Sequence, residues 1–147
     1  MVVFKYPGKA GTTLVNDLKI FRSSEMLLIK AEALAATNDL TGAAALIQQL
    51  RVARNSDPAL PVYANQTEAF GDIMDERRVE LVFEGHRWLD LKRLGTRANR
   101  SMERDPRDCE LTNQCALANS DHRYTLPIPR AETDINPEIK NQQNPGY

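Results

Sequence analysis

Apolar residues recur at helical spacing through the first third of the chain. Residues 21–37 contain no Gly or Pro, and their apolar positions are Met26, Leu27, Ala31, Leu34 and Ala35. A second run, from about Thr41 to Arg54, repeats the spacing at Ala43, Leu46, Ile47, Leu50 and Ala53. Asn38 and Asp39 tolerate turn geometry and separate the two runs. The pattern therefore predicts an antiparallel helical hairpin over residues 20–55.

This hairpin resembles the tetratricopeptide pattern, a helix–turn–helix repeat of 34 residues. The matching packing positions are Leu27, Ala31, Leu34, Ala43, Ile47 and Leu50. An ordinary amphipathic hairpin explains the same residues equally well. Only one such unit is present, and repeats of this kind need about three stacked neighbours. We therefore expect the remaining helices, or segments outside the chain, to complete the core, and the chain alone to expose apolar surface.

A third helix is predicted over residues 67–94. The preceding segment contains Pro58 and Pro61 and reads as a loop, after which Thr67 is a suitable N-cap and Glu68 a favourable first-turn residue. Gly85 costs about 1 kcal/mol relative to Ala inside a helix. It therefore marks either a kink or the close approach of another element.

Glu76, Glu80 and Glu84 are spaced four residues apart on this predicted helix. Such aligned carboxylates could bind a metal or act as acid and base. The alternative is a ladder of ion pairs within the helix, Glu80 with Arg77 and Glu84 with Arg87. We favour the ladder, because a di-iron site needs a Glu-x-x-His step and carboxylates on partner helices, whereas His86 is only two residues after Glu84 and lies on a different face. The chain also has neither a nucleophile motif nor a glycine-rich phosphate loop. No enzymatic activity, metal or cofactor is predicted.

The rest of the chain has little periodicity. Residues 2–6 and 126–129 are candidates for short strands. Residues 98–123 are polar and read as a long inserted loop, of a length that is often functional, and residues 124–147 as an ordered tail that packs on the helices. The predicted fold is mainly α, with short strands and long irregular loops, in one domain over residues 1–147.

The composition argues against some classes of function. The 147 residues carry 19 Lys and Arg against 20 Asp and Glu, a net charge of −1, which argues against nucleic-acid binding. No apolar run approaches the roughly 18 residues of a membrane-spanning helix. The first residues also lack the basic start and apolar stretch of a secretory signal.

The segment from Asp75 to Arg93 reads D-E-R-R-V-E-L-V-F-E-G-H-R-W-L-D-L-K-R and resembles the signature of the SusD/RagB family. Residues 17–33, the Leu50–Arg54 end of the second helix, residues 126–132 and the final Asn-Pro-Gly-Tyr resemble further landmarks of that family, in the same order. The chain is similar to the C-terminal portion of such proteins. The structural signature then comprises Glu76, Arg77, Arg78, Glu80, Glu84, Gly85, Arg87, Trp88 and Asp90.

The resemblance implies binding rather than catalysis. Family members are lipid-anchored at the bacterial cell surface, where they bind oligosaccharides or other nutrients and work with a SusC-like TonB-dependent transporter of the outer membrane. The resemblance implies that the anchor would lie outside the residues of this chain. No ligand residue carries over, although Tyr63 and Tyr124 are candidates for stacking on a sugar if they are exposed; packing or ordinary surface is the plainer interpretation of both. Trp88 is expected in the core.

Cys109 and Cys115 have five residues between them. They lack the usual zinc spacing, and a metal would need two more ligands. The compartment that the family implies favours a disulfide over two free thiols. A stand-alone tetratricopeptide-like module for protein–protein interaction remains the alternative to nutrient binding.

Overall fold

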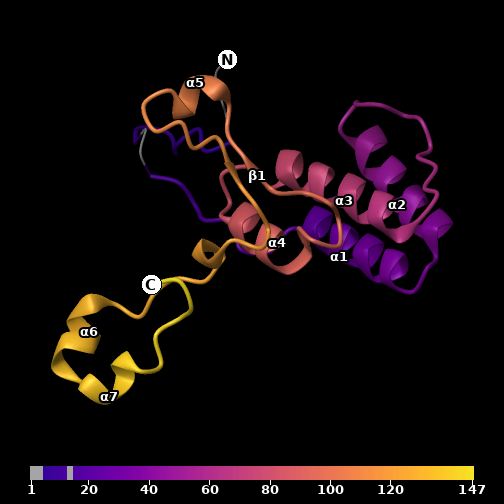
Figure 1. Ribbon diagram of the computed structural model, residues 1–147. Helices are drawn as coiled ribbons and strands as arrows, with labels where there is room; N and C mark the ends of the chain where they lie inside the picture. The colour runs from indigo at the N-terminus through magenta and orange to yellow at the C-terminus, as the bar shows by residue number, and fades with distance from the viewer. Residues whose placement is uncertain (1–4, 13–14) are drawn as a thin grey trace.

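The computed structural model describes residues 5–12 and 15–147. Its body consists of four packed helices, α1 (Ser23–Ala36), α2 (Leu40–Ala53), α3 (Gln66–Glu80) and α4 (His86–Leu94). The helices α1 and α2 form a hairpin, and α3 packs against both (Figure 1). The prediction of a mainly α fold is confirmed.

Local sequence explains the turn between α1 and α2. Asn38 adopts a positive φ of 66°, a conformation that Asn tolerates better than most residues. Asp39 follows as the N-cap of α2 and accepts a 2.8 Å hydrogen bond from the Gly42 amide. Both helices begin and end within two residues of the predicted bounds.

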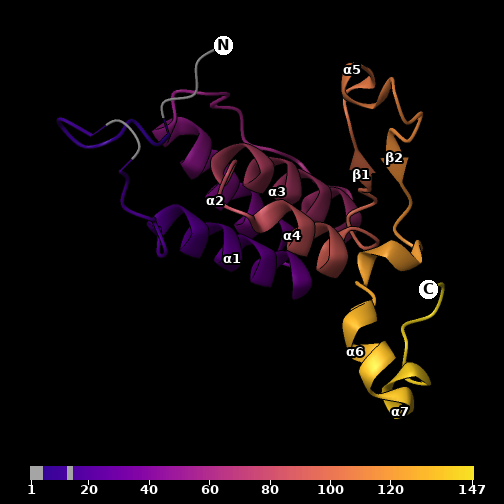
Figure 2. The same cartoon turned by 90° about the vertical axis from the view of Figure 1, so that its left-hand side faces the viewer.

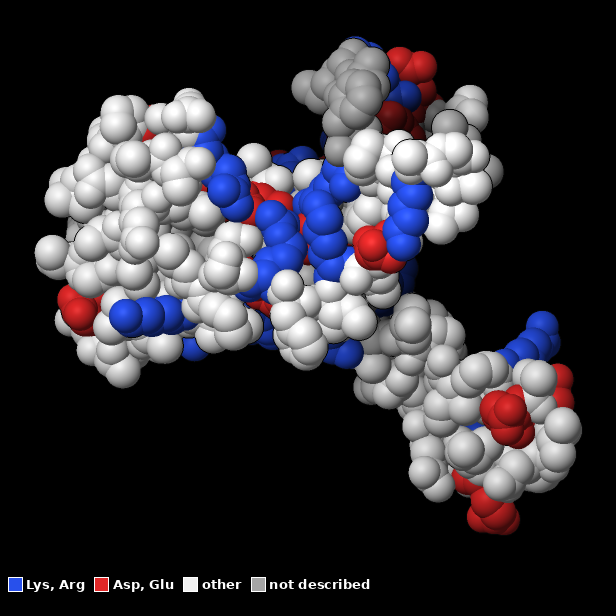
Figure 3. All heavy atoms as spheres, turned by 180° about the vertical axis from the view of Figure 1, so that it is seen from behind, with Lys and Arg blue, Asp and Glu red and all other residues white. Residues whose placement is uncertain are grey.

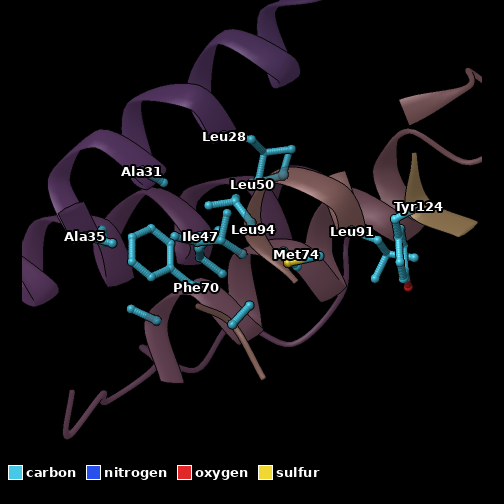
Figure 4. Close-up of a cluster of buried hydrophobic side chains, with 14 of the residues drawn as sticks. Leu28, Ala31, Ala35, Ile47, Leu50, Phe70, Met74, Leu91, Leu94 and Tyr124 are labelled. Carbon is cyan, nitrogen blue, oxygen red and sulfur yellow. The ribbon is translucent and has the colours of Figure 1, made fainter. Parts of the chain in front are cut away.

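The core lies where α1, α2 and α3 meet and continues under α4 (Figure 4). Phe70 of α3 is its largest fully buried side chain and is 1% exposed. The guanidinium of Arg97 covers this ring at 4.3 Å from its centroid. The helices also contribute Leu28, Ala31, Ala35, Ala43, Ile47, Leu50, Ala69, Ile73, Met74, Leu91 and Leu94.

The predicted single helix over residues 67–94 is wrong, because a turn divides it. The helix α3 ends at Glu80, and α4 begins at His86 after Phe83 and Gly85 have taken positive φ values of 63° and 81°. No neighbour lies within 4 Å of a Cβ built at Gly85. Backbone conformation, rather than a close approach, therefore explains the glycine.

The start of α3 also differs from the prediction. Asn65, not Thr67, is the N-cap, and its side chain accepts a 3.0 Å hydrogen bond from the Glu68 amide. The Glu68 carboxylate in turn accepts one from the Ala64 amide at 2.8 Å. This reciprocal arrangement is close to a capping box, which the pattern Asn-x-x-Glu could have indicated.

The predicted inserted loop over residues 98–123 contains regular structure. β1 (Met102–Glu103) pairs antiparallel with β2 (Ala116–Leu117), with Met102 opposite Leu117. The helix α5 (Pro106–Cys109) lies near the tip, and η1 (His122–Tyr124) follows β2. A disulfide joins Cys109 to Cys115, with the Cα atoms 5.3 Å apart. We call residues 102–117 the disulfide hairpin.

The tail contributes less to the core than predicted. The helices α6 (Arg130–Ile135) and α7 (Pro137–Lys140) contain no buried residue, and residues 126–129 form no strand. Figures 1 and 2 show this segment projecting away from the helical body. The candidate strand over residues 2–6 lies largely outside the described residues; Lys5 and Tyr6 are bends.

Candidate functional site

The signature segment is organised around a buried ion pair between α3 and α4. Arg77 Nε donates to Asp90 Oδ2 at 2.8 Å, and the two side chains are only 4% and 6% exposed. The other oxygen of Asp90 accepts from Arg93, which also binds Glu32 of α1. Asp90 thus links α3 to α4, and Arg93 extends the connection to α1. Removal of Arg77 or Asp90 would leave an uncompensated buried charge.

The predicted ladder within one helix is wrong, because its acidic residues pair with other elements. Glu80 accepts hydrogen bonds from Arg54, which follows α2, at 2.8 and 2.9 Å and from Arg22, which precedes α1. Glu84 lies in the turn and binds Arg22 and Lys5 at 2.5 Å. The break after Glu80 removes the helical spacing on which the ladder depended.

These ion pairs hold the glutamates in the charged form. Hydrogen bonds from Arg54 are the largest cause that lowers the pKa of Glu80, to about 2. Burial acts against ionisation of Glu84, but Lys5 and Arg22 outweigh it and its pKa is lowered as well. Figure 3 shows basic side chains gathered across the middle of one face, with acidic side chains between them. Such compensated charges are suited to holding segments together rather than to acid–base chemistry.

Tyr63 and Glu76 belong to a further structural cluster. Arg51 of α2 binds Asp72 at 2.6 Å and Glu76 at 2.8 Å, both on α3. The Tyr63 hydroxyl donates to Asp72 at 2.7 Å, and burial followed by this hydrogen bond raises the Tyr63 pKa. Tyr63 is half-buried, and its hydroxyl is engaged. The structure thus places this candidate sugar contact in a packing role.

Tyr124, the other candidate sugar contact, also has a packing role. It is 6% exposed, so the exposure that stacking on a sugar would need is not present, and packing, the plainer interpretation, describes it. Its ring stacks on Trp88 with centroids 4.9 Å apart. Its hydroxyl accepts from the Met102 amide at 3.1 Å and donates to the Leu117 carbonyl at 3.3 Å. Tyr124 therefore attaches the base of the disulfide hairpin to α4.

Trp88 borders a hollow between α4 and the disulfide hairpin. It is half-buried rather than fully in the core, and it packs against the core cluster. One cavity of about 310 Å³ lies beside it, and its other polar lining comes from Arg104, Thr112, Gln114 and Arg123. A ring beside guanidinium, hydroxyl and amide groups can combine apolar contact with directed hydrogen bonds. We call this cavity the hairpin cleft.

Sequence reasoning missed the residues of the hairpin that line this cleft. Arg104, Thr112 and Gln114 lie within the stretch that was predicted only as a loop. The disulfide favoured for Cys109 and Cys115 was the one signal of a fixed loop in this stretch, but it did not indicate which residues line the cleft. The structure brings the hairpin close to Trp88 but leaves the candidate Tyr63 outside the cleft lining.

The two remaining signature arginines, Arg78 and Arg87, also lie near Trp88. Both line a second cavity, of about 290 Å³, with Trp88, Leu91, Met102 and Glu103. Arg87 Nη1 is buried without a hydrogen-bond partner.

Among residues 5–12 and 15–147, no three His, Cys, Asp or Glu residues are grouped to hold a metal ion. Within the same residues, no helix is long and apolar enough to cross a membrane.

The fold and the cleft define a helical scaffold that carries a polar, aromatic-lined hollow. The family model of the SusD family matches residues 4–147, and the chain belongs to this family. It is 40% identical over 95 residues to a SusD-like protein, P38, of Formosa agariphila. The match covers 60% of this chain and 18% of that relative, so the matched segment spans under a fifth of the relative's length. No solved structure matches the chain.

Proposed function

We propose that the chain serves in the binding and uptake of a glycan or similar nutrient at the bacterial outer membrane, as the C-terminal part of a SusD-like protein. Membership of the SusD family supports this proposal, because proteins of that family bind nutrients and are not enzymes. The family also works at the outer membrane with TonB-dependent transporters. In the proposed complex, the chain lies at the cell surface beside such a transporter.

The hairpin cleft is the observation that carries the ligand-binding proposal. Sugars offer apolar C–H faces to aromatic rings and hydroxyl groups to planar polar side chains, and the cleft provides Trp88 together with Gln114 and Arg104. Tyr124 stacks on the Trp88 ring, and the disulfide restrains the hairpin. Both features reduce the entropic cost of ordering the site on binding.

Apolar side chains on and before α1 are the proposed contact with the transporter. Phe21 is 88% exposed, and Leu18, Ile20, Met26 and Ile29 are exposed too. A group of large exposed apolar residues is typical of an interaction surface. Exposed apolar surface was expected from the sequence for a different reason, namely that segments outside the chain would pack on it and complete the core.

A glycan array tests ligand binding directly, with the chain and the longer protein that contains it. Gln114→Ala is expected to weaken binding of the best glycan about tenfold, because one polar contact is removed. Gln142→Ala is the matched control, since Gln142 is exposed on the tail, outside the cleft. A folded protein that binds no glycan or other nutrient would contradict the proposal.

A further inference from the structure

Arg78 and Arg87 differ from the other arginines of the signature segment in having no acidic partner. Their neighbours Arg77 and Arg100 pair with Asp90 and Asp75 at 2.8 and 2.7 Å. Within the part of the chain that the structure describes, neither Arg78 nor Arg87 forms an ion pair. Arg78 is exposed, whereas Arg87 is half-buried with one Nη buried and unbonded. A buried guanidinium N–H without an acceptor is costly, and the Nη1 of Arg77 is buried and unbonded as well. Neither atom is accessible to solvent, so an anion in a cavity beside Arg87 would meet its other guanidinium nitrogens.

The two side chains share a polar cavity of about 310 Å³, which also includes Asn99 and Ser101. Two carboxylates line it as well. Both oxygens of Asp75 already accept from Arg100, at 2.7 to 3.2 Å. Glu103 of β1 forms no ion pair with any described residue. Three arginines against two acids leave the lining with a net charge of +1.

Electrostatics make this position receptive to an anion. Burial lowers the pKa of Arg87, and the nearby positive charge of Arg78 lowers it further. Asp75, Asp90 and Tyr124 raise the pKa of Arg87, but by less than burial and Arg78 lower it. Arginine stays protonated in proteins, so the site holds two cations whose repulsion a bound oxyanion would relieve.

We propose that Arg78 and Arg87 bind the oxyanion of an acidic sugar, either the carboxylate of a uronic acid or a sulfate ester. This inference rests on the proposed nutrient-binding function and narrows its ligand class. Arginine pairs suit both groups, because the planar guanidinium donates two parallel hydrogen bonds to a carboxylate or sulfate. The arginines also line the neighbouring cavity beside Trp88, so a sugar ring attached to the anion would meet an aromatic and apolar wall.

Titration calorimetry with the whole chain tests the ligand class. The probes are trigalacturonate for the carboxylate, a sulfated carrageenan oligosaccharide for the sulfate ester, and maltotriose as the neutral sugar. We expect at least one acidic probe to bind about tenfold or more tightly than maltotriose, with affinity that falls as salt is raised. The probe that binds more tightly identifies the group.

Two variants test whether Arg78 and Arg87 cause the preference for acidic sugars. Arg78→Gln and Arg87→Gln are each expected to weaken binding of the acidic probe about tenfold and to leave maltotriose binding unchanged. Lys92→Gln is the control, because it removes one positive charge from an exposed position of the same helix. If Arg87→Gln does not fold, Arg87→Lys replaces it, with a smaller expected loss because the forked donor geometry disappears.

Sodium sulfate and sodium acetate separate this inference from the proposed function. We expect either anion to shift the Nε–Hε NMR resonance of Arg87. A shift with no oligosaccharide bound would support the anion site and contradict the glycan function. Equal binding of acidic and neutral sugars, or unchanged affinity of both Arg→Gln variants for acidic probes, would overturn the anion site and leave nutrient binding standing.

Discussion

The helical body and the C-terminal segment both contain helices, but different forces hold them. Residues of α1 to α4 surround a continuous core, and buried ion pairs such as Arg77–Asp90 link the helices. In residues 125–147, the bonds are local and near the surface. The Gln143 amide bonds both backbone groups of Ile128 at 2.8 and 3.2 Å, and Asn136 caps α7. No residue of α6 or α7 is buried.

The comparison shows that a segment can have well-defined hydrogen bonds and still contribute little to the free energy of unfolding. Exposed hydrogen bonds contribute little net free energy, because water offers equivalent partners in the unfolded chain. Burial of apolar side chains supplies most of the stabilisation in the body. We therefore expect the body to unfold as one cooperative unit, and the C-terminal segment to open separately at lower cost.

The largest expected loss of stability comes from a substitution in the core. Phe70→Ala removes a ring that is 1% exposed and leaves a cavity among three helices, which should lower the free energy of unfolding by about 3–5 kcal/mol. Urea denaturation followed by circular dichroism measures it. Phe83→Ala is the matched control at a 67% exposed position and should cost about 0.5 kcal/mol or less. Equal losses in both variants would contradict the assignment of the core.

A smaller loss of stability is expected from substitution of Glu80, and the size of this loss depends on pH. The pKa of Glu80 lies near 2 in the folded protein, below the ordinary value of 4.5, so its ionised form stabilises the fold above about pH 4.5. This contribution is lost as pH falls from about 4.5 to 2. At pH 7, Glu80→Gln should cost roughly 2 kcal/mol, a figure reduced for the solvent around half-exposed Arg54.

Urea denaturation of the wild type and Glu80→Gln at several pH values tests this. The difference between them should shrink toward zero near pH 2. Glu138→Gln, at an exposed position of α7, serves as the control and should change stability at pH 7 by about 0.5 kcal/mol or less. A difference between wild type and Glu80→Gln that stays constant from pH 7 to pH 2 would disprove the proposed linkage.

The smallest effect is expected from the C-terminal segment. Deletion of residues 125–147 removes no core side chain, so the free energy of unfolding should fall by only about 1 kcal/mol or less. The deletion also removes the edge-on packing of Tyr147 against His122, which lies at the surface. Thermal denaturation of the shortened chain measures the change. A loss of stability as large as that of Phe70→Ala would mean that the segment stabilises the body.

The sequence predicted the parts of the fold that depend on local pattern. The bounds of α1 and α2 followed from apolar spacing and from the turn at Asn38 and Asp39. The break after Glu80 was missed because Leu81, Val82 and Phe83 continue an apolar pattern, while the decisive positive φ of Phe83 has no sequence signal. The pair β1–β2 was missed because two-residue strands are too short to show alternation.

The candidate site was predicted only in part. The signature residues were identified by resemblance, and the structure gives their partners, which lie far away in the chain. Arg54 meets Glu80 across 26 residues, and Arg22 meets the same glutamate across 58. Such pairings depend on helix packing, which spacing along one helix does not encode. The cleft was missed for the same reason, since it forms only where the disulfide hairpin meets Trp88.

The attachment of the disulfide hairpin at its base has an evolutionary consequence. Tyr124 holds both strands through the backbone of Met102 and Leu117, so the anchor does not depend on the side chains at the tip. Cys109 and Cys115 close the tip independently of the helices. Residues between the strands are therefore free to change in identity and number at little cost to the scaffold. If the hairpin cleft binds the ligand as proposed, changes in these residues would alter ligand preference while the helical core stays the same.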